Sequence, residues 1–387
     1  MSENVYLVGA ARTPVGSFQG NLAGLSAPEL GAHAVSAALK HSAIEGNDVD
    51  EVILGNVVSA GLKQAPARQA MRIAGLPDAV GATTINKVCG SGMKATMLAT
   101  DLIRAGSAQR VVAGGMESMS NAPYVVHKAR SGLRMGHAEM KDALFLDGLE
   151  DAETGGSMGS FAQQTADDYQ LSREAMDAYA TESVMRARKA IEQQSLKDEI
   201  APIELGGEVI IDDEQPGRAK LDKIPSLRPA FKADGTITAA NSSSISDGAS
   251  ALVLASESAL EGREPLAKIV GHATHSIHPS EFTIAPVGAI NKLANNIGWD
   301  LADVDLFEIN EAFAMVTMLA IQELGLDHAR VNIYGGACAQ GHPIGSTGSR
   351  LIVTLAHALK ATGGTRGIAA LCIGGGEATA IALERSA

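Results

Sequence analysis

Short apolar runs alternate with stretches of helical spacing at the start of this chain. The runs at 5–10, 50–58 and 110–115 predict strands, and the stretches at 28–40 and 93–105 predict helices. A helix that joins two strands of one sheet crosses over its face, so the strands run parallel. The alternation therefore predicts an α/β fold with a mostly parallel sheet and helices on both faces.

The end of the chain repeats this pattern. Strands are expected at 268–271, 306–310 and 367–372, and helices at 288–297, 312–324 and 347–360. In the first half, a helix that begins at Ser91 leads to a strand that ends in Gly114-Gly115. In the second half, a helix that begins at Thr347 leads to a strand that ends in the glycines 374–376. We interpret this as an internal duplication that places both helix N-termini near a shared centre, although any two β-α-β units look alike.

Residues 119–241 differ from both ends of the chain, because polar helices and charged loops replace the apolar strands. A polar helix is expected at 172–193, and the charged loop at 212–228 contains Pro216 and Pro225. A buried-strand pattern returns at 247–255 and completes the first sheet. We therefore predict three parts: a first half of residues 1–118 plus 242–265, an inserted loop domain of residues 119–241, and a second half of residues 266–387.

Composition excludes several classes of protein. Lysine and arginine number 31 against 44 aspartate and glutamate, a formal charge of −13, which argues against a nucleic-acid partner. No apolar run approaches the roughly 18 residues that span a bilayer, and the start of the sequence has no signal-peptide pattern. Three cysteines do not make a disulfide framework and fit a reducing compartment. We expect a cytoplasmic protein that binds no membrane.

Cys89 is the first candidate for chemistry. It lies in Asn86-Lys-Val-Cys-Gly-Ser-Gly-Met-Lys, where a strand turns into a helix. Gly90 and Gly92 permit a tight turn, and the free N–H groups of a helix N-terminus lower a thiol pKa toward the reactive thiolate. The alternative is a small buried apolar cysteine. The turn favours a nucleophile.

His342 is the candidate base. It stands in a glycine-rich loop before a helix, and Pro343 stiffens that loop. A histidine in this setting is interpreted as a base near neutral pH, rather than as a surface residue. The spacing from Cys338 to His342 also fits half of a metal site, but no second pair at matching spacing exists, so we predict no metal.

Cys372 ends a strand and leads into three glycines, the first of which is Gly374. Those glycines let a substrate approach the backbone and offer N–H groups to an oxyanion. A phosphate cradle is the alternative, but Glu377 would place a negative charge there, and neither the Gly-x-Gly-x-x-Gly pattern nor the P-loop pattern is present.

Asn310 follows the strand residues 306–309, at an edge where α/β sheets usually place their sites. A cap of the next helix is the simpler interpretation of Asn310, with Glu311 as an acid in the first helical turn.

Together these segments resemble the thiolase family, and the resemblance runs almost end to end. Its motifs are Asn86-Lys-Val-Cys, Asn310-Glu-Ala-Phe-Ala, Gly341-His-Pro-Ile-Gly and Cys372-Ile-Gly-Gly-Gly, with Arg12-Thr-Pro-Val-Gly and Gly114-Gly-Met-Glu-Ser. Within the family the chain is most similar to acetoacetyl-CoA thiolases. The resemblance implies a five-layered α-β-α-β-α core with the loop domain over the CoA site.

The resemblance also implies a mechanism. His342 would take the proton of Cys89, whose thiolate attacks an acyl-CoA and releases CoA, and Cys372 would take an α-proton from a second acetyl-CoA. His342 and a water held by Asn310 would bind one thioester oxygen, and the N–H groups of Cys89 and Gly374 the other. The implied CoA-binding residues are Leu149, Met158, Arg218, Ser243, Ile245, Phe282, Ala312 and Phe313.

The implied reaction is the reversible condensation of two acetyl-CoA to acetoacetyl-CoA plus CoA, in a homodimer or homotetramer, with no metal, nicotinamide or other cofactor. The alternative is a degradative 3-ketoacyl-CoA thiolase of broader chain length in fatty-acid β-oxidation. Ser157 supports it, because short-chain enzymes usually have histidine before the methionine. A non-catalytic acyl-CoA-binding protein is the alternative of another class. For Arg218, an ordinary solvated loop arginine remains an alternative to a phosphate contact.

Overall fold

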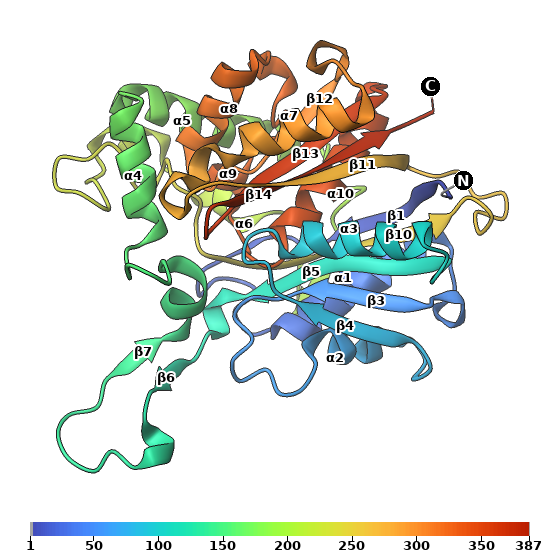
Figure 1. The fold of residues 1–387 in the computed structure, drawn as a ribbon, viewed down its shortest axis with the longest axis horizontal. Helices are drawn as coiled ribbons and strands as arrows, with labels where there is room; N and C mark the ends of the chain where they lie inside the picture. Colours follow the sequence, from blue (N-terminus) through green and yellow to red (C-terminus); the bar gives the residue numbers. More distant parts are fainter. Residues whose placement is uncertain (1–2, 387) are drawn as a thin grey trace.

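The computed structural model describes residues 3–386 (Figure 1). The first half contains β1 (Val5–Arg12), β2 (Gly16–Ser17), α1 (Ala27–Ser42), β3 (Glu51–Gly55), α2 (Pro66–Ile73), β4 (Gly81–Ile85), α3 (Ser91–Arg104), β5 (Arg110–Ser118) and β10 (Ser246–Ser256). The second half contains β11 (Ala267–Ser276), α7 (Ala285–Ile297), β12 (Leu306–Ile309), α8 (Ala314–Leu324), α9 (Ala337–Gln340), α10 (Thr347–Thr362), β13 (Arg366–Ile373) and β14 (Glu377–Glu384).

The strands follow the order β4-β3-β5-β10-β1-β11-β14-β13-β12, with β2 paired to β10. Read outward from the junction of β1 and β11, the order β1-β10-β5-β3 of the first half corresponds to β11-β14-β13-β12 of the second, and β4 extends the first half by one strand. The junction itself is short, since only Val5 to Leu7 of β1 pair with β11. The molecule therefore has two sheets joined at one edge, as two similar halves require.

The expectation of a mostly parallel sheet is wrong. The pairs β3–β4, β3–β5 and β12–β13 are parallel, whereas β1–β10, β10–β5, β11–β14 and β13–β14 are antiparallel. The reason is clearest at β13 and β14, because the three glycines between them form a tight turn, and a turn that short joins only antiparallel strands.

Side chains on alternate positions of the strands divide the core into layers. Val5 and Leu7 of β1 face a central cluster that includes α3 and α10, whereas Val8 and Ala11 face α1 and α2. The other sheet packs its outer face against α7. The layers are therefore α-β-α-β-α, with α3 and α10 between the sheets (Figure 1).

The two central helices touch at their N-terminal ends. A Cβ on Gly92 of α3 would lie 2.4 Å from Ser349 Oγ, and a Cβ on Gly348 of α10 would lie 2.5 Å from the Met93 backbone nitrogen. Glycine is therefore required on both helices at the crossing. This contact brings the segments before both helices, which contain Cys89 and His342, to the centre of the molecule.

We expected Gly114 and Gly115 to end their strand, but they lie inside β5. A Cβ on Gly115 would come within 2.0 Å of the Gly345 carbonyl oxygen. The missing side chain therefore admits the loop that contains His342 against the face of the first sheet.

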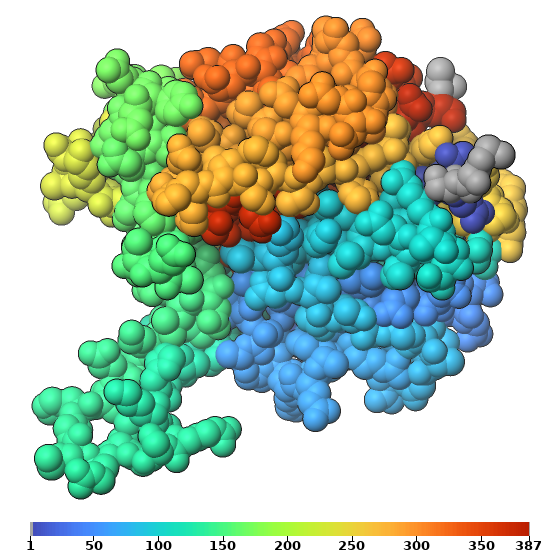
Figure 2. Space-filling view, viewed as in Figure 1, coloured from blue at the N-terminus to red at the C-terminus, as the bar shows by residue number. Residues whose placement is uncertain are grey.

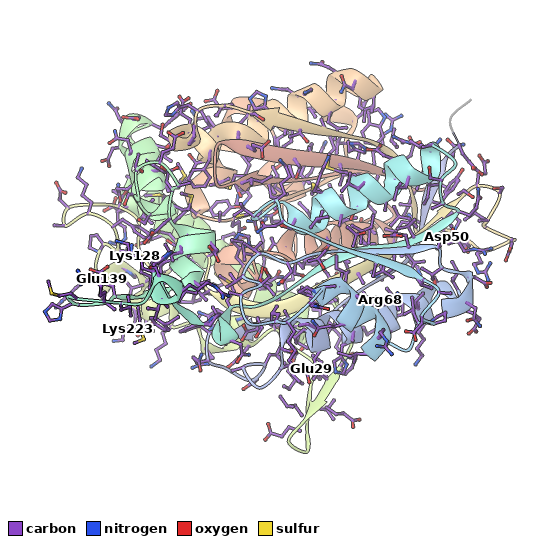
Figure 3. The ribbon with its side chains drawn as sticks, turned by 60° about the horizontal axis from the view of Figure 1, so that its bottom comes forward. Glu29, Asp50, Arg68, Lys128, Glu139 and Lys223 are labelled. Carbon is purple, nitrogen blue, oxygen red and sulfur yellow. The ribbon has the colours of Figure 1, made fainter. Side chains whose placement is uncertain are left out.

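Residues 119–241 form the region that we predicted as a loop domain. Its elements are β6 (Tyr124–Val126), β7 (Met140–Asp142), the π-helix Phe145–Leu149, α4 (Met158–Asp168), α5 (Arg173–Glu192), β8 (Ile203–Leu205), β9 (Glu208–Ile210) and α6 (Glu214–Arg218). Helix α5 packs on α8 and α9 of the second half, and α4 on the turn Pro279–Ile284. The β6–β7 hairpin projects from the body (Figure 2), and its exposed residues Lys128 and Glu139 are labelled in Figure 3.

A buried ion cluster joins this region to the first half. The Arg12 guanidinium lies 2.6 Å from Glu199 and 2.6 Å from Asp213, and all three side chains are about 1% exposed.

Strand β10 lies between β1 and β5, and therefore within the first half, to which we assigned residues 242–265. Of the predicted division, residues 1–2 and 387 lie outside the described residues. Across residues 3–386, no helix combines the length and apolarity needed to cross a membrane.

Candidate active site

Cys89 lies in a strained turn between β4 and α3. The residue before it, Val88, has φ +46°, which is uncommon for a β-branched side chain. Ser91 secures the turn, because its hydroxyl accepts the Lys87 N–H at 2.8 Å and donates to the Val88 carbonyl at 2.7 Å. The half-buried thiol is thus held immediately before the first turn of α3.

Cys372 comes from the other half and is fully buried near the end of β13. After Ile373 the chain turns through the glycines, where Gly375 and Gly376 have φ +93° and +86°. The Gly374 N–H in this turn is close enough to Cys89 to lower the pKa of its thiol, and Cys89 is close enough for its charge to raise the pKa of Cys372. Two thiols and one backbone donor therefore meet where the halves join.

The resting protonation states differ from our expectation. Burial raises the pKa of Cys89, whereas the N–H groups of Gly374 and of Cys89 itself lower it. The effect of burial is larger, so the pKa is about 11. Burial, with a contribution from the Arg350 charge, lowers the pKa of His342 to about 3. The lowered thiol pKa that we expected for Cys89 is therefore wrong for the resting site, and the pKa of His342 lies below neutrality rather than near it. The site holds a neutral thiol and a neutral imidazole, because desolvation outweighs the helix N-terminus.

His342 is fixed in its loop by both backbone and side chain. Its backbone N–H donates to the Ser244 carbonyl at 3.0 Å, and its ring nitrogen Nδ1 lies 2.6 Å from Thr347 Oγ1. The other ring nitrogen, Nε2, is buried and has no hydrogen-bond partner among residues 3–386. Ile344, two residues later, packs in the same apolar cluster as Cys89. The free nitrogen is therefore available to a reacting group in this centre.

Asn310 does not cap a helix. Helix α8 begins at Ala314 with Phe313 at its N-cap. Both polar side-chain atoms of Asn310 are buried without a partner, whereas its backbone N–H donates to the Ala370 carbonyl at 3.0 Å. A buried amide with no partner is costly unless a water or ligand satisfies it, so this side chain is suited to hold one.

Glu311 is not an acid in a helical first turn either. Its carboxylate accepts hydrogen bonds from the Tyr179 hydroxyl at 3.1 Å, the Ser183 hydroxyl at 2.7 Å and the Cys338 backbone N–H at 3.1 Å. These bonds attach α5 to the second half, so its role is structural. Cys338 is buried beside it, and that burial raises its pKa. No group of three His, Cys, Asp or Glu side chains within residues 3–386 could hold a metal ion.

The predicted CoA-binding residues fall into groups. Leu149 and Ile245 pack in the apolar cluster of Cys89 and Ile344. Others pack in the cluster that contains Cys372, and these are Met158, Phe282, Ala312 and Phe313. Met158 lies directly over the glycine turn, since a Cβ on Gly374 would be 3.1 Å from its sulfur. The clusters thus place apolar walls beside both cysteines.

Ser243 and Arg218 lie differently. The Ser243 hydroxyl donates to the Ala312 carbonyl at 3.0 Å, which links the two segments. Arg218 is 61% exposed and pairs with Glu214 at 2.6 Å. It lines an open pocket of about 470 Å³ with Ile245, Ser244 and Phe18 among other residues. The structure thus places Arg218 away from the thiols, at the opening of a surface pocket that shares Ile245 with the apolar wall.

Sequence reasoning assigned no role to two residues that organise this site. Thr347 holds the His342 ring, and Glu117 accepts backbone N–H groups of Val57, Val58 and Gly345 at 2.9–3.1 Å. Burial raises the pKa of Glu117 to about 7. The available signal was an acidic residue in an otherwise apolar strand, which needs partners when it is buried.

Comparisons with known proteins agree with this geometry. Residues 5–258 match the family model described as "Thiolase, N-terminal domain", and residues 263–385 match "Thiolase, C-terminal domain". An acetyl-CoA acetyltransferase of Schizosaccharomyces pombe is 47% identical, over 100% of both chains. An acetyl-CoA acetyltransferase of Escherichia coli is 46% identical, over 99% of both chains.

Solved structures are similar over the whole chain. The Acat5 thiolase of Ascaris suum in complex with coenzyme A has a TM-score of 0.95 at 43% identity, covering 99% of this chain and 100% of that chain. The human mitochondrial 3-ketoacyl-CoA thiolase in complex with CoA has a TM-score of 0.96 at 38% identity, covering 99% and 98%.

Proposed function

The chain belongs to the thiolase family, and from this premise we propose how its residues perform acyl transfer. It is an acyltransferase that acts on CoA thioesters, and its reaction is the reversible condensation of two acetyl-CoA to acetoacetyl-CoA plus CoA. The observation that carries the residue assignment is the proximity of Cys89, Cys372 and the Gly374 N–H, together with a histidine whose loop packs in the Cys89 cluster and whose Nε2 has no hydrogen-bond partner among the described residues.

The first step is transfer of the acyl group to Cys89. His342 Nε2 takes the thiol proton as the sulfur attacks the thioester carbonyl, and the N–H groups of Cys89 and Gly374 stabilise the oxyanion. The carbon–sulfur bond to CoA then breaks, and the departing CoA thiolate takes a proton from Cys372. This leaves an acyl thioester on Cys89 and a thiolate on Cys372, with the first proton on His342.

The second step forms the carbon–carbon bond. The Cys372 thiolate takes an α-proton from acetyl-CoA, and the resulting carbanion attacks the acyl carbon. Cys89 leaves as a thiolate and regains its proton from His342, so the cycle closes with both thiols neutral. Two cysteines are needed because one stores the acyl group while the other moves the proton. A water on Asn310, together with His342, would bind the oxygen of the second thioester.

No metal or redox cofactor enters these steps, so we propose that CoA thioesters are the only small molecules required. The apolar walls beside the two cysteines would receive the pantetheine arm. Arg218 at the opening of its pocket would meet a phosphate of the nucleotide end.

A degradative 3-ketoacyl-CoA thiolase of broader chain length is the second candidate. Ser157 favours it, since this small side chain caps α4 directly before Met158 and leaves more room than a histidine. Rates of thiolysis of acetoacetyl-CoA and of a long-chain 3-ketoacyl-CoA separate the two. A long-chain rate equal to or above the acetoacetyl-CoA rate would replace the first candidate by the second.

We also propose a homodimer or homotetramer in the cytoplasm. Strand β4 is an edge of the sheet, and the β6–β7 hairpin exposes Tyr124, Met135 and Met140 to solvent at 63%, 86% and 72%. Unpaired edges and exposed apolar side chains favour association. All three cysteines are free, and the chemistry needs two of them reduced. Light scattering of the purified protein tests the assembly, and a monomeric mass would contradict it.

A further inference from the structure

The two ring nitrogens of His342 have opposite surroundings. Nδ1 lies 2.6 Å from Thr347 Oγ1, whereas Nε2 is buried and has no partner in the part of the chain that the structure describes. A neutral imidazole carries its hydrogen on only one of these nitrogens. Only the form with the hydrogen on Nδ1 leaves Nε2 able to accept a proton from a thiol.

Thr347 decides between the two forms. Its hydroxyl oxygen also lies 3.0 Å from the Pro343 carbonyl oxygen, which can only accept a hydrogen bond. If the hydroxyl hydrogen pointed at His342 Nδ1, two oxygens would face each other at 3.0 Å with no hydrogen between them. The hydroxyl therefore donates to Pro343, and its oxygen accepts the Nδ1 hydrogen of His342.

The backbone holds this arrangement in place. The same Pro343 carbonyl accepts the N–H groups of Ser346 at 2.9 Å and Thr347 at 3.0 Å, where α10 begins. The His342 N–H is bound to the Ser244 carbonyl. A Cβ on Gly341 would collide with Ser246 Oγ at 2.1 Å, so the loop lies directly on the next segment. The threonine and the histidine consequently have little freedom to separate.

We propose that Thr347 is a positioning residue, which holds the hydrogen of His342 on Nδ1 so that Nε2 accepts the proton of Cys89. The proposal rests on the assignment of His342 as the base. The same bond serves the protonated state, because the imidazolium keeps its Nδ1 hydrogen and donates it more strongly to Thr347. Thr347 thus favours both the correct neutral form and the cation that arises during acylation.

The test compares four variants of the full-length protein. Thr347→Val keeps the shape and removes the hydroxyl, and Thr347→Ser keeps the hydroxyl. Thr362→Val is the matched control, because Thr362 lies on the same helix and donates to the carbonyl four residues earlier, Ala358, at 2.8 Å, whereas its hydrogen bonds within residues 3–386 involve no histidine. His342→Ala tests the base itself. Each is assayed for thiolysis of acetoacetyl-CoA and for alkylation of Cys89 by iodoacetamide, located by mass spectrometry.

We expect Thr347→Val to lower kcat and the alkylation rate about 10- to 100-fold with little change in KM, as for other groups that orient a functional histidine. Thr347→Ser should stay within about threefold of the original protein, and Thr362→Val should match it. A Thr347→Val rate equal to that of Thr362→Val, with His342→Ala inactive, would overturn the positioning role and leave the base assignment intact. Full activity of His342→Ala would instead overturn the base assignment.

A measurement on the unsubstituted protein does not depend on folding of the Thr347 variants. Nitrogen-15 NMR of histidine-labelled protein, with His342 assigned from the spectrum of His342→Ala, reports which ring nitrogen carries the hydrogen. We expect the hydrogen on Nδ1. A hydrogen on Nε2 in the resting protein would overturn the proposal.

Discussion

The backbone N–H of Gly374 lies close enough to the sulfur of Cys89 to lower the pKa of that thiol, although the two residues belong to different halves of the molecule. Cys89 is placed by the turn before α3, and Gly374 by the hairpin between β13 and β14. Neither half alone contains a complete site. The packing of α3 against α10 and β14 therefore sets the geometry of the proposed nucleophile and its proposed oxyanion donor together.

The two cysteines should separate by function. With radiolabelled acetyl-CoA, we expect Cys89→Ser to retain no label. Cys372→Ser should retain label on Cys89 but form no acetoacetyl-CoA, because it cannot move the α-proton. Label retained on the Cys89→Ser protein would show that another residue is the nucleophile. Unchanged activity of the same variant would indicate a non-catalytic role for Cys89.

Gly374→Ala should slow acylation without unfolding the protein. The added methyl would lie 3.1 Å from the Met158 sulfur, so either the methionine or the turn must shift, and we expect the turn to shift and misalign the N–H donor from Cys89. Loss of alignment of one oxyanion donor predicts a fall in kcat of about tenfold or more. Gly24→Ala, where a Cβ meets nothing within 4 Å, is the control. Equal kcat in both variants would remove Gly374 from the oxyanion site.

The ion pair between Lys87 and Glu377 should affect activity more than stability. It links the turn that holds Cys89 to the first residue of β14 after the glycine turn, and its side chains are 21% and 33% exposed. Glu377→Gln should lower kcat by less than about fivefold, as partly exposed pairs contribute little. Added salt should lower the rate of the original protein toward that of the variant. Glu261→Gln, whose pairs with Arg110 and Arg263 lie elsewhere, should show no such convergence.

The burial of neutral His342 predicts a pH-dependent stability difference. Its pKa is about 3 in the folded protein against 6.5 for the free side chain, so the unfolded chain binds the additional proton between these values. The contribution of His342 is therefore largest above pH 6.5 and is lost as the pH falls toward 3. Relative to the original protein, the Tm of His342→Ala should rise as the pH is lowered from 7 to about 4.5.

Thermal unfolding at the two pH values, followed by circular dichroism, measures that difference. His33→Ala, at an exposed histidine on α1, is the control. The use of differences between variants cancels the contributions of other buried groups, among them Glu117 and Glu308, whose pKa values burial raises to about 7 and about 8. A Tm difference for His342→Ala that stays constant with pH would contradict a buried neutral histidine.

The sequence by itself determined the class of fold and indicated the residues that we propose for the chemistry. Strand and helix periodicities are local, so the elements at both ends of the chain appear close to their predicted bounds, as for α3 at Ser91–Arg104 and α10 at Thr347–Thr362. The motifs around Cys89, His342, Cys372 and Asn310 were recognisable for the same reason, because each is a short segment whose glycines set its own backbone.

Only the tertiary structure decided how those segments act on one another. Strand direction, the unpartnered amide of Asn310 and the bond from His342 to Thr347 depend on neighbours that local patterns do not specify. The protonation states are the clearest case. A helix N-terminus is visible in sequence and predicts a lowered thiol pKa, but desolvation by surrounding side chains raises the pKa of Cys89 to about 11. Burial is a property of the whole fold, and here it outweighs the local field.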